Sequence, residues 1–139
     1  MNIRKENEKK KEYLLRYKTH KKEAERYERD IDEYRSCKII KSLNNSGMPT
    51  SHSKKDLSDY IVKIDEIISK TIMEKYMAVE ACKEIRERIE LLENDYERDV
   101  LTYRYIYNWS WDKIAEHEHY SVKHIQRIHG NALRNFTMS

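Results

Sequence analysis

Apolar side chains recur at helical spacing along most of the chain. In the first third they stand three and four residues apart, and Lys, Arg and Glu fill the positions between them. This heptad stripe predicts one helix from Glu6 to Leu43. Tyrosine in place of leucine makes a weak coiled coil, so we expect the stripe to pack against another element. Its members are Tyr13, Tyr17, His20, Ala24, Tyr27, Ile31 and Tyr34.

A second stripe follows a clear break. Residues 44–53 hold the only proline and a cluster of small polar residues, which predicts a loop. Ser53 and Asp56 resemble a capping box that would start a helix near Lys54, and helical period then continues to about Glu93. Two such helices predict a long antiparallel hairpin over residues 1–93, with each helix covering the stripe of the other. The second stripe consists of Leu57, Tyr60, Ile61, Ile64, Ile68, Ile72, Tyr76, Val79, Cys82, Ile85, Ile89 and Leu92.

Shorter elements are predicted over residues 94–139, which we interpret as a separate domain. Asn94, Ser110 and Ser121 each stand where a side-chain oxygen can cap the start of a helix. The three helices that follow these caps are expected over residues 96–107, 111–118 and 122–136.

Composition supports an all-α fold. Charged residues make up 38% of the chain, and two glycines and one proline are too few for the turns of β-rich or βαβ folds or for glycine-rich phosphate loops. No apolar run approaches the roughly 18 residues that span a bilayer, and the N-terminus lacks the apolar core of a signal peptide. We therefore expect a cytosolic protein with no membrane partner.

Several kinds of chemical site are not indicated. Cys37 and Cys82 are isolated, so neither a disulfide framework nor a zinc site is predicted. His117 and His119 fall on different helix faces with no cysteine near, which speaks against a metal site that could also include Glu118 and His124. No nucleophile with its base, paired carboxylates or phosphate loop stands out, so we expect no enzyme and no cofactor.

The last two predicted helices have the packing pattern of a helix-turn-helix. That motif needs apolar residues where its helices cross and a small residue early in the first. Glu118 and His119 depart from it, since the motif prefers an apolar residue and a glycine there, although histidine tolerates the left-handed conformation. The positions that agree are Ile114, Ala115, Tyr120, Ile125 and Ile128.

Charge is unevenly spread. The formal net charge of +3 is weak support for a polyanionic partner. Residues 119–139, however, contain no Asp or Glu, so the final helix is predicted to be a cationic rod. Its basic residues are Lys123, His124, Arg127, His129 and Arg134.

The packing pattern assigns candidate DNA contacts. Inward-facing Ile125 and Ile128 would turn Val122 and the polar residues of the first two turns toward DNA. Arg127 or Lys123 could bind guanine, Gln126 could pair with adenine, and Val122 could touch a thymine methyl. Ser110 and the amides after it could hold a phosphate. We interpret Trp109 and Trp111 as packing groups rather than base-stacking groups. The candidate DNA-binding set is Ser110, Trp111, Ser121, Val122, Lys123, His124, Gln126, Arg127 and Arg134.

A family resemblance rests on residues 97–105, 110–115 and 121–136. These stretches resemble the fourth conserved region of bacterial sigma factors, in which the last helix likewise begins with Ser or Thr and carries Ile, Ile and Ala-Leu. With residues 47–49 and 56–60 included, the whole arrangement resembles phage-encoded regulators of Gram-positive bacteria, the late-gene activators of the RinA and ArpU type. The resemblance implies promoter binding, with base-reading positions among Val122, Lys123, Gln126 and Arg127.

The sequence-based hypothesis is thus a phage transcriptional regulator that binds double-stranded DNA with or beside host RNA polymerase, in the bacterial cytoplasm and nucleoid. One small module offers few contacts, so a dimer through the hairpin, or joint binding with RNA polymerase, is expected. Two alternatives remain. The chain could be a phage terminase small subunit that recognises the packaging site, or a helical adaptor that never touches DNA.

Overall fold

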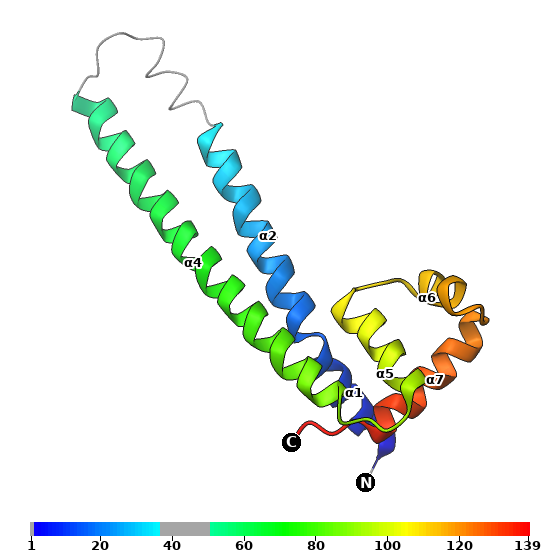
Figure 1. The fold of residues 1–139 in the computed structure, drawn as a ribbon. Coiled ribbons are helices and arrows are strands. Elements are labelled where there is room, and N and C mark those ends of the chain that lie inside the picture. The colour runs from blue at the N-terminus through cyan, green and yellow to red at the C-terminus, as the bar shows by residue number, and fades with distance from the viewer. Residues whose placement is uncertain (1, 37–50) are drawn as a thin grey trace. The chain divides into compact units, whose positions relative to one another are not determined.

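The computed structural model describes residues 2–36 and 51–139 and gives the side chains of 2–36 and 55–139. The described residues are helical with no strand, which confirms the predicted all-α class (Figure 1). The helices are α1 (Ile3–Leu14), α2 (Arg16–Arg35), α4 (Ser51–Ile89), α5 (Asp95–Leu101), the π-helix η1 (Thr102–Ile106), α6 (Trp111–Glu118) and α7 (Val122–Asn135).

The first predicted helix is two helices. α1 begins at Ile3, where Asn2 Oδ1 accepts a hydrogen bond from the Arg4 N–H at 3.1 Å, and the helical ladder is interrupted at Leu15. The Leu15 N–H still bonds the Lys11 carbonyl at 2.9 Å, so the interruption is one residue long. No glycine or proline lies near Leu15, so the sequence does not predict this interruption. The prediction for residues 37–43, Cys37 included, lies outside the described residues.

α4 starts earlier and ends earlier than its stripe suggested. Residues 44–50 of the predicted loop lie outside the described residues, whereas 51–53 are helical, so the predicted start near Lys54 is wrong. Ser53 lies inside the helix rather than at its cap. At the other end the Leu92 N–H bonds the Ile89 carbonyl at 3.0 Å, a tightened last turn that closes the helix before Glu93.

The helices divide into two compact units. One comprises residues 20–76, and the other combines the N-terminal segment to Thr19 with residues 77–139. The predicted functional division at residue 94 stays a prediction.

In the unit of residues 20–76, α2 and α4 run antiparallel, because residue 20 pairs with 74 and residue 34 with 60. His20 Nδ1 lies 2.6 Å from a Glu74 carboxylate oxygen, and the Tyr60 hydroxyl donates to the Tyr34 carbonyl at 2.6 Å. Every member of the first predicted stripe in this unit is buried or half-buried, as expected. The buried side chains are Ala24, Ile31, Tyr60, Ile67 and Thr71.

The second predicted stripe mixed two faces of α4. Ile61, Ile72 and Tyr76 were expected to face the first helix, and they are exposed instead, as is Val79. Buried Ile67 was not among the predicted positions. On a helix, residues five apart point about 140° away from each other, so Ile67 and Ile72 cannot share a face. α4 therefore has an apolar face on each side.

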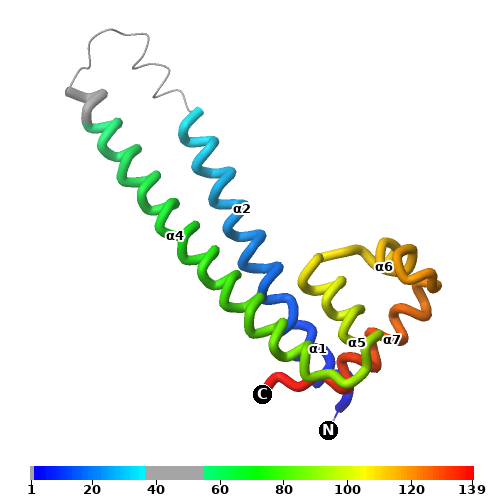
Figure 2. Tube along the Cα trace, in the orientation of Figure 1, coloured from blue at the N-terminus to red at the C-terminus, as the bar shows by residue number. Residues whose placement is uncertain are grey.

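The other unit joins both ends of the chain in one core. Leu14 of α1 is buried with Ile85 of α4, Leu133 of α7 and Phe136, and the Tyr13 ring lies 5.8 Å from that of Phe136. In Figure 2 the first helical turns lie beside the last ones, as these contacts require. α1 thus belongs to the same compact unit as residues 77–139. We call this unit the C-terminal module.

The predicted helix 96–107 is correct only in its first half. Asn94 caps α5, with its Oδ1 accepting from the Glu97 N–H at 3.1 Å. The backbone then widens into η1, where the Tyr107 N–H bonds the Thr102 carbonyl five residues back at 3.0 Å. The helical period no longer applies here, and adjacent Tyr105 and Ile106 are both buried.

Candidate DNA-binding surface

Two helices and a three-residue turn form the candidate surface. Ser110 Oγ accepts from the Lys113 N–H at 3.2 Å, and Ser121 Oγ accepts from the His124 N–H at 3.1 Å, so both predicted N-caps are present. Between them His119 adopts the left-handed conformation, with φ 59° and ψ 39°. The Tyr120 N–H closes the turn on the Ala115 carbonyl at 3.0 Å. A histidine therefore fills the position for which glycine is preferred.

The crossing of α6 and α7 is apolar. Ile114, Ala115 and Ile125 are buried together with Val100 of α5, and Ile128 packs against them half-buried. Tyr120 differs from the expectation, because its side chain is 39% exposed. Its ring lies nearly perpendicular to that of His124, with ring centroids 4.6 Å apart. The backbone of Tyr120 closes the turn, and its ring covers the flank of α7.

Aromatic packing fixes the start of α6. Tyr103 stacks on Trp109 with ring centroids 4.7 Å apart, and the Lys113 ammonium lies 4.5 Å over the same indole. Burial, and next the charge of Glu118, raise the pKa of the Tyr103 phenol, which keeps it neutral. Trp109 is therefore engaged within the fold, in agreement with its interpretation as a packing group.

Arg104 of η1 ties the second tryptophan into the same region. Its guanidinium lies 4.1 Å over the Trp111 ring and donates to the Trp109 carbonyl at 3.0 Å. Trp111 is half-buried, and its ring also lies nearly perpendicular to that of His129, with ring centroids 4.8 Å apart. Most of the surface of Trp111, a predicted DNA contact, is therefore already covered by other groups of the protein.

His129 does not belong to the cationic face. It is buried, and its Nε2 lies 2.6 Å from the Tyr105 hydroxyl. Burial, and next the charges of Lys11 and Arg104, lower its pKa to about 4. The histidine is therefore neutral at physiological pH, and the predicted cationic residues of α7 are fewer by one.

Four predicted contact residues share the outer face of α7. Lys123, Gln126, Arg127 and Arg134 are exposed, and their spacing places them within about 100° of one another around the helix axis. In residues 2–36 and 55–139, no hydrogen bond or ion pair engages any of these four side chains. We call them the α7 outer face. Ser110 and Ser121 are also exposed, whereas Val122 and His124 are half-buried rather than turned fully outward.

The two helix N-termini differ in charge. The first turn of α7 contains no acidic residue, while that of α6 contains Asp112. A carboxylate beside free N–H groups weakens their attraction for an anion. The N–H groups after Ser121 would therefore attract an anion more strongly than those after Ser110, the position that the sequence favoured.

One cation near α7 was not predicted from the sequence. Lys10 of α1 donates to the carbonyls of Leu133 at 2.8 Å and Arg134 at 3.3 Å, at the carboxyl end of α7. A cation at that end of a helix offsets the helix dipole. Since 123 residues separate Lys10 from Leu133, no local sequence signal could have revealed the pair.

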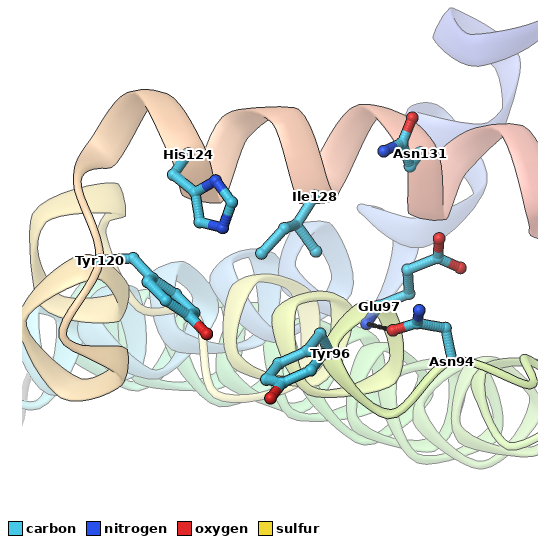
Figure 3. Close-up of a pocket in the computed structure, with 7 residues that line it drawn as sticks. All are labelled: Asn94, Tyr96, Glu97, Tyr120, His124, Ile128 and Asn131. Atoms are coloured by element: carbon cyan, nitrogen blue, oxygen red, sulfur yellow. Dashed lines mark hydrogen bonds between the residues drawn. The ribbon is translucent and has the colours of Figure 1, made fainter.

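A pocket of about 220 Å³ lies on the other flank of α7 (Figure 3). Tyr96 and Tyr120 meet edge to face at 6.4 Å, and His124 and Ile128 project from α7 toward them. Each carboxylate oxygen of buried Glu97 accepts from Asn135 Nδ2 at 3.1 Å. His124 is the only predicted contact residue among the seven that line this pocket. The pocket is therefore distinct from the α7 outer face.

The described residues contain no group of three or more His, Cys, Asp or Glu side chains placed to hold a metal ion. None of their helices combines the length and hydrophobicity needed to cross a membrane. Cys82 is a free, half-buried thiol. Comparison of the chain with protein-family models, curated proteins and solved structures found no match.

Gly130 lies inside the α7 helix, where no packing contact requires a glycine. A Cβ built at this position would meet nothing within 4 Å, and a helix-interior glycine costs about 0.5–1 kcal/mol relative to alanine. Gly130→Ala is therefore expected to raise the free energy of unfolding by about 0.5–1 kcal/mol. Urea unfolding followed by circular dichroism measures the change. Gly130→Ser should give a smaller rise, and a loss of stability in both variants would contradict the expectation.

Proposed function

We propose that this protein is a sequence-specific DNA-binding transcriptional regulator in which α6 and α7 act as a helix-turn-helix and α7 enters the major groove. The observation that carries the proposal is the α7 outer face. It presents Lys123, Arg127 and Arg134 with the amide of Gln126, unpaired within the described part of the chain. Because no Asp or Glu follows Glu118, no acid of α7 offsets these charges.

The chemistry of this face suits readout of base edges. In the first turns, Lys123 and Arg127 can donate to guanine and Gln126 can pair with adenine. Arg134 lies two turns further along and suits a phosphate. Free amides at the start of α7, with no acid beside them, add a second phosphate contact.

The biological setting is proposed from the resemblance to sigma region four and to RinA- and ArpU-type regulators. It is activation of phage late genes at promoters in the bacterial host cytoplasm and nucleoid, with or beside host RNA polymerase. A homo-oligomer through α2 and α4 would supply the second DNA contact that one module lacks.

Selection from a pool of randomised duplexes tests this function. The wild-type chain should enrich a defined sequence, and Lys123→Ala with Arg127→Ala should raise Kd for that sequence about 5- to 150-fold per residue. The slope of log K against log salt should fall by about 0.9 for each phosphate that the variant no longer binds. The slope should change little where the removed side chain bound only a base.

A matched variant separates specific readout from net charge. Lys83→Ala with Arg86→Ala removes the same charge from exposed positions of α4 and should leave the Kd for the selected sequence nearly unchanged. An equal rise in Kd for the two double variants would indicate charge without readout. No enrichment, together with no duplex binding at low salt, would contradict the proposed function and favour an adaptor.

A further inference from the structure

α4 carries an apolar face that nothing in its own unit covers. Among the described residues of the 20–76 unit, all the exposed large apolar side chains are on α4 and none is on α2. They are Ile61 at 51% exposure, Val62 at 56%, Ile72 at 64%, Met73 at 58% and Tyr76 at 62%.

Three of these residues, Ile61, Ile72 and Tyr76, form one stripe, and Val62 and Met73 lie about 100° to one side of Ile61 and Ile72. Ile61 and Ile72 are eleven residues apart, just over three full turns, so they lie nearly in line along the helix. Half-buried Ile68 lies between them near the same line, and Tyr76 follows Ile72 by one turn. We call this stripe the α4 outer face. It is separate from the buried residues, such as Ile67, that pack against α2.

A helix that is apolar on two sides is normally covered on both. The charges on the α4 outer face indicate what covers it. Asp65 follows Ile61 by one turn and Lys75 follows Ile72 by three residues, so an acid and a base border the same stripe. Within the described residues Asp65 has no ion-pair partner, and Lys75 pairs with Glu28 through side chains that remain 59% and 45% exposed.

These positions are symmetric about residue 70. Asp65 and Lys75 lie five residues on either side of it, and Ile68 and Ile72 lie two residues on either side. An antiparallel second copy centred there therefore sets Asp65 against Lys75 of the second copy, twice by symmetry, and Ile68 against Ile72 of the second copy. Parallel pairing in register would set Asp65 against Asp65 and Lys75 against Lys75, which is unfavourable.

We propose that the α4 outer face is the interface of a two-fold homodimer in which two copies of α4 pack antiparallel about residue 70. Such an interface is isologous, with the same surface buried on each copy. The proposed function includes a homo-oligomer, and this proposal names the surface through which it forms. The dimer itself does not depend on DNA binding. If both proposals hold, the two-fold symmetry predicts an inverted-repeat target sequence.

Sedimentation equilibrium of the full chain without DNA tests the dimer. The wild type should sediment as a dimer, and Ile72→Glu should be monomeric because it places a charge at the centre of the stripe. Circular dichroism of Ile72→Glu should keep its helix content, since the side chain is exposed in the single chain. Leu15→Glu, at an exposed apolar position outside the stripe, is the matched control and should remain dimeric.

Charge reversal tests the antiparallel register. Asp65→Lys and Lys75→Asp should each raise the dimer dissociation constant more than about tenfold, because like charges then oppose each other. The double variant should recover the wild-type value to within a few-fold. Glu28→Gln controls for the loss of the Lys75 pair within one chain and should leave the dimer intact.

The outcomes separate the two proposals. A monomeric wild type, a ring of more subunits, or no recovery in the charge-reversed double variant overturns this interface, whatever the DNA result. A dimer with all the expected variant effects supports it even if the randomised duplexes yield no sequence.

Discussion

Leu14→Ala is expected to lower the free energy of unfolding of the C-terminal module by about 2–5 kcal/mol. Leu14 is fully buried and shares its core with Leu101, Leu133 and Phe136, although more than 80 residues separate it from each of them. Truncation to alanine removes three carbons and leaves a cavity among groups that cannot all collapse into it.

Tryptophan fluorescence can follow the unfolding of the C-terminal module alone. The chain has two, Trp109 and Trp111, and both pack beside the α6–α7 core. Urea unfolding followed by tryptophan fluorescence therefore reports the C-terminal module. If α1 is part of that cooperative unit, a change in α1 must move the fluorescence midpoint.

The neighbouring residue provides the control. Leu15 is 39% exposed, and Leu15→Ala should lower the free energy of unfolding by less than about 1 kcal/mol. A Leu14→Ala variant with wild-type tryptophan unfolding would contradict the shared core and would favour independent folding of residues 94–139.

Stability should also fall as the pH drops below about 6.5, because of His129. Burial lowers the pKa of this histidine to about 4 in the folded protein, while the unfolded chain titrates near 6.5. The unfolded state then binds the proton first. The stabilisation is complete above pH 6.5 and is lost as the pH falls toward 4, up to about 3 kcal/mol in total.

The interval from pH 6.5 to 5 is best for the measurement, because most carboxylates are still ionised there. His129→Gln keeps a polar side chain able to reach the Tyr105 hydroxyl but does not titrate. Urea midpoints of this variant should lose most of the pH dependence seen in the wild type. His119→Gln, at an exposed position, should keep it, and equal pH slopes in the wild type and His129→Gln would contradict the burial argument.

Local signals in the sequence were sufficient for the C-terminal elements. Serine caps and apolar spacing predicted α6 over its observed range and the start of α7, and both depend only on neighbouring residues. The π-helix was missed because Thr102–Ile106 contains no residue that breaks an α-helix. Its wider turn leaves consecutive Tyr105 and Ile106 both buried, an outcome that 3.6-residue periodicity cannot predict.

Periodicity also failed on α4, for a different reason. The spacing of apolar residues shows which of them share a face of a helix. Where a helix has apolar residues on two sides, the spacing does not show which side is buried. The predicted stripe correctly included buried Tyr60, Ile85 and Ile89. It also included exposed Ile61 and Ile72 and omitted buried Ile67 and Thr71. Only the position of α2, fixed by pairs such as His20 with Glu74, shows which side faces inward.

The candidate DNA surface was also predicted from the sequence only in part. Sequence alone identified the acid-free final helix and the exposed face of Lys123, Gln126 and Arg127, since charge content and spacing along one helix are local properties. It could not remove His129 from that surface, because its neutral state results from burial against Tyr105.

The sequence by itself determined the all-α class, the caps and the cationic character of α7, because each depends on residues within a few positions of one another. The tertiary structure alone decided that α1 completes the core of the C-terminal module, that Lys10 reaches the end of α7, and that α4 has an outer apolar face. Burial and long-range contacts are made between segments that carry no record of each other in their local sequence.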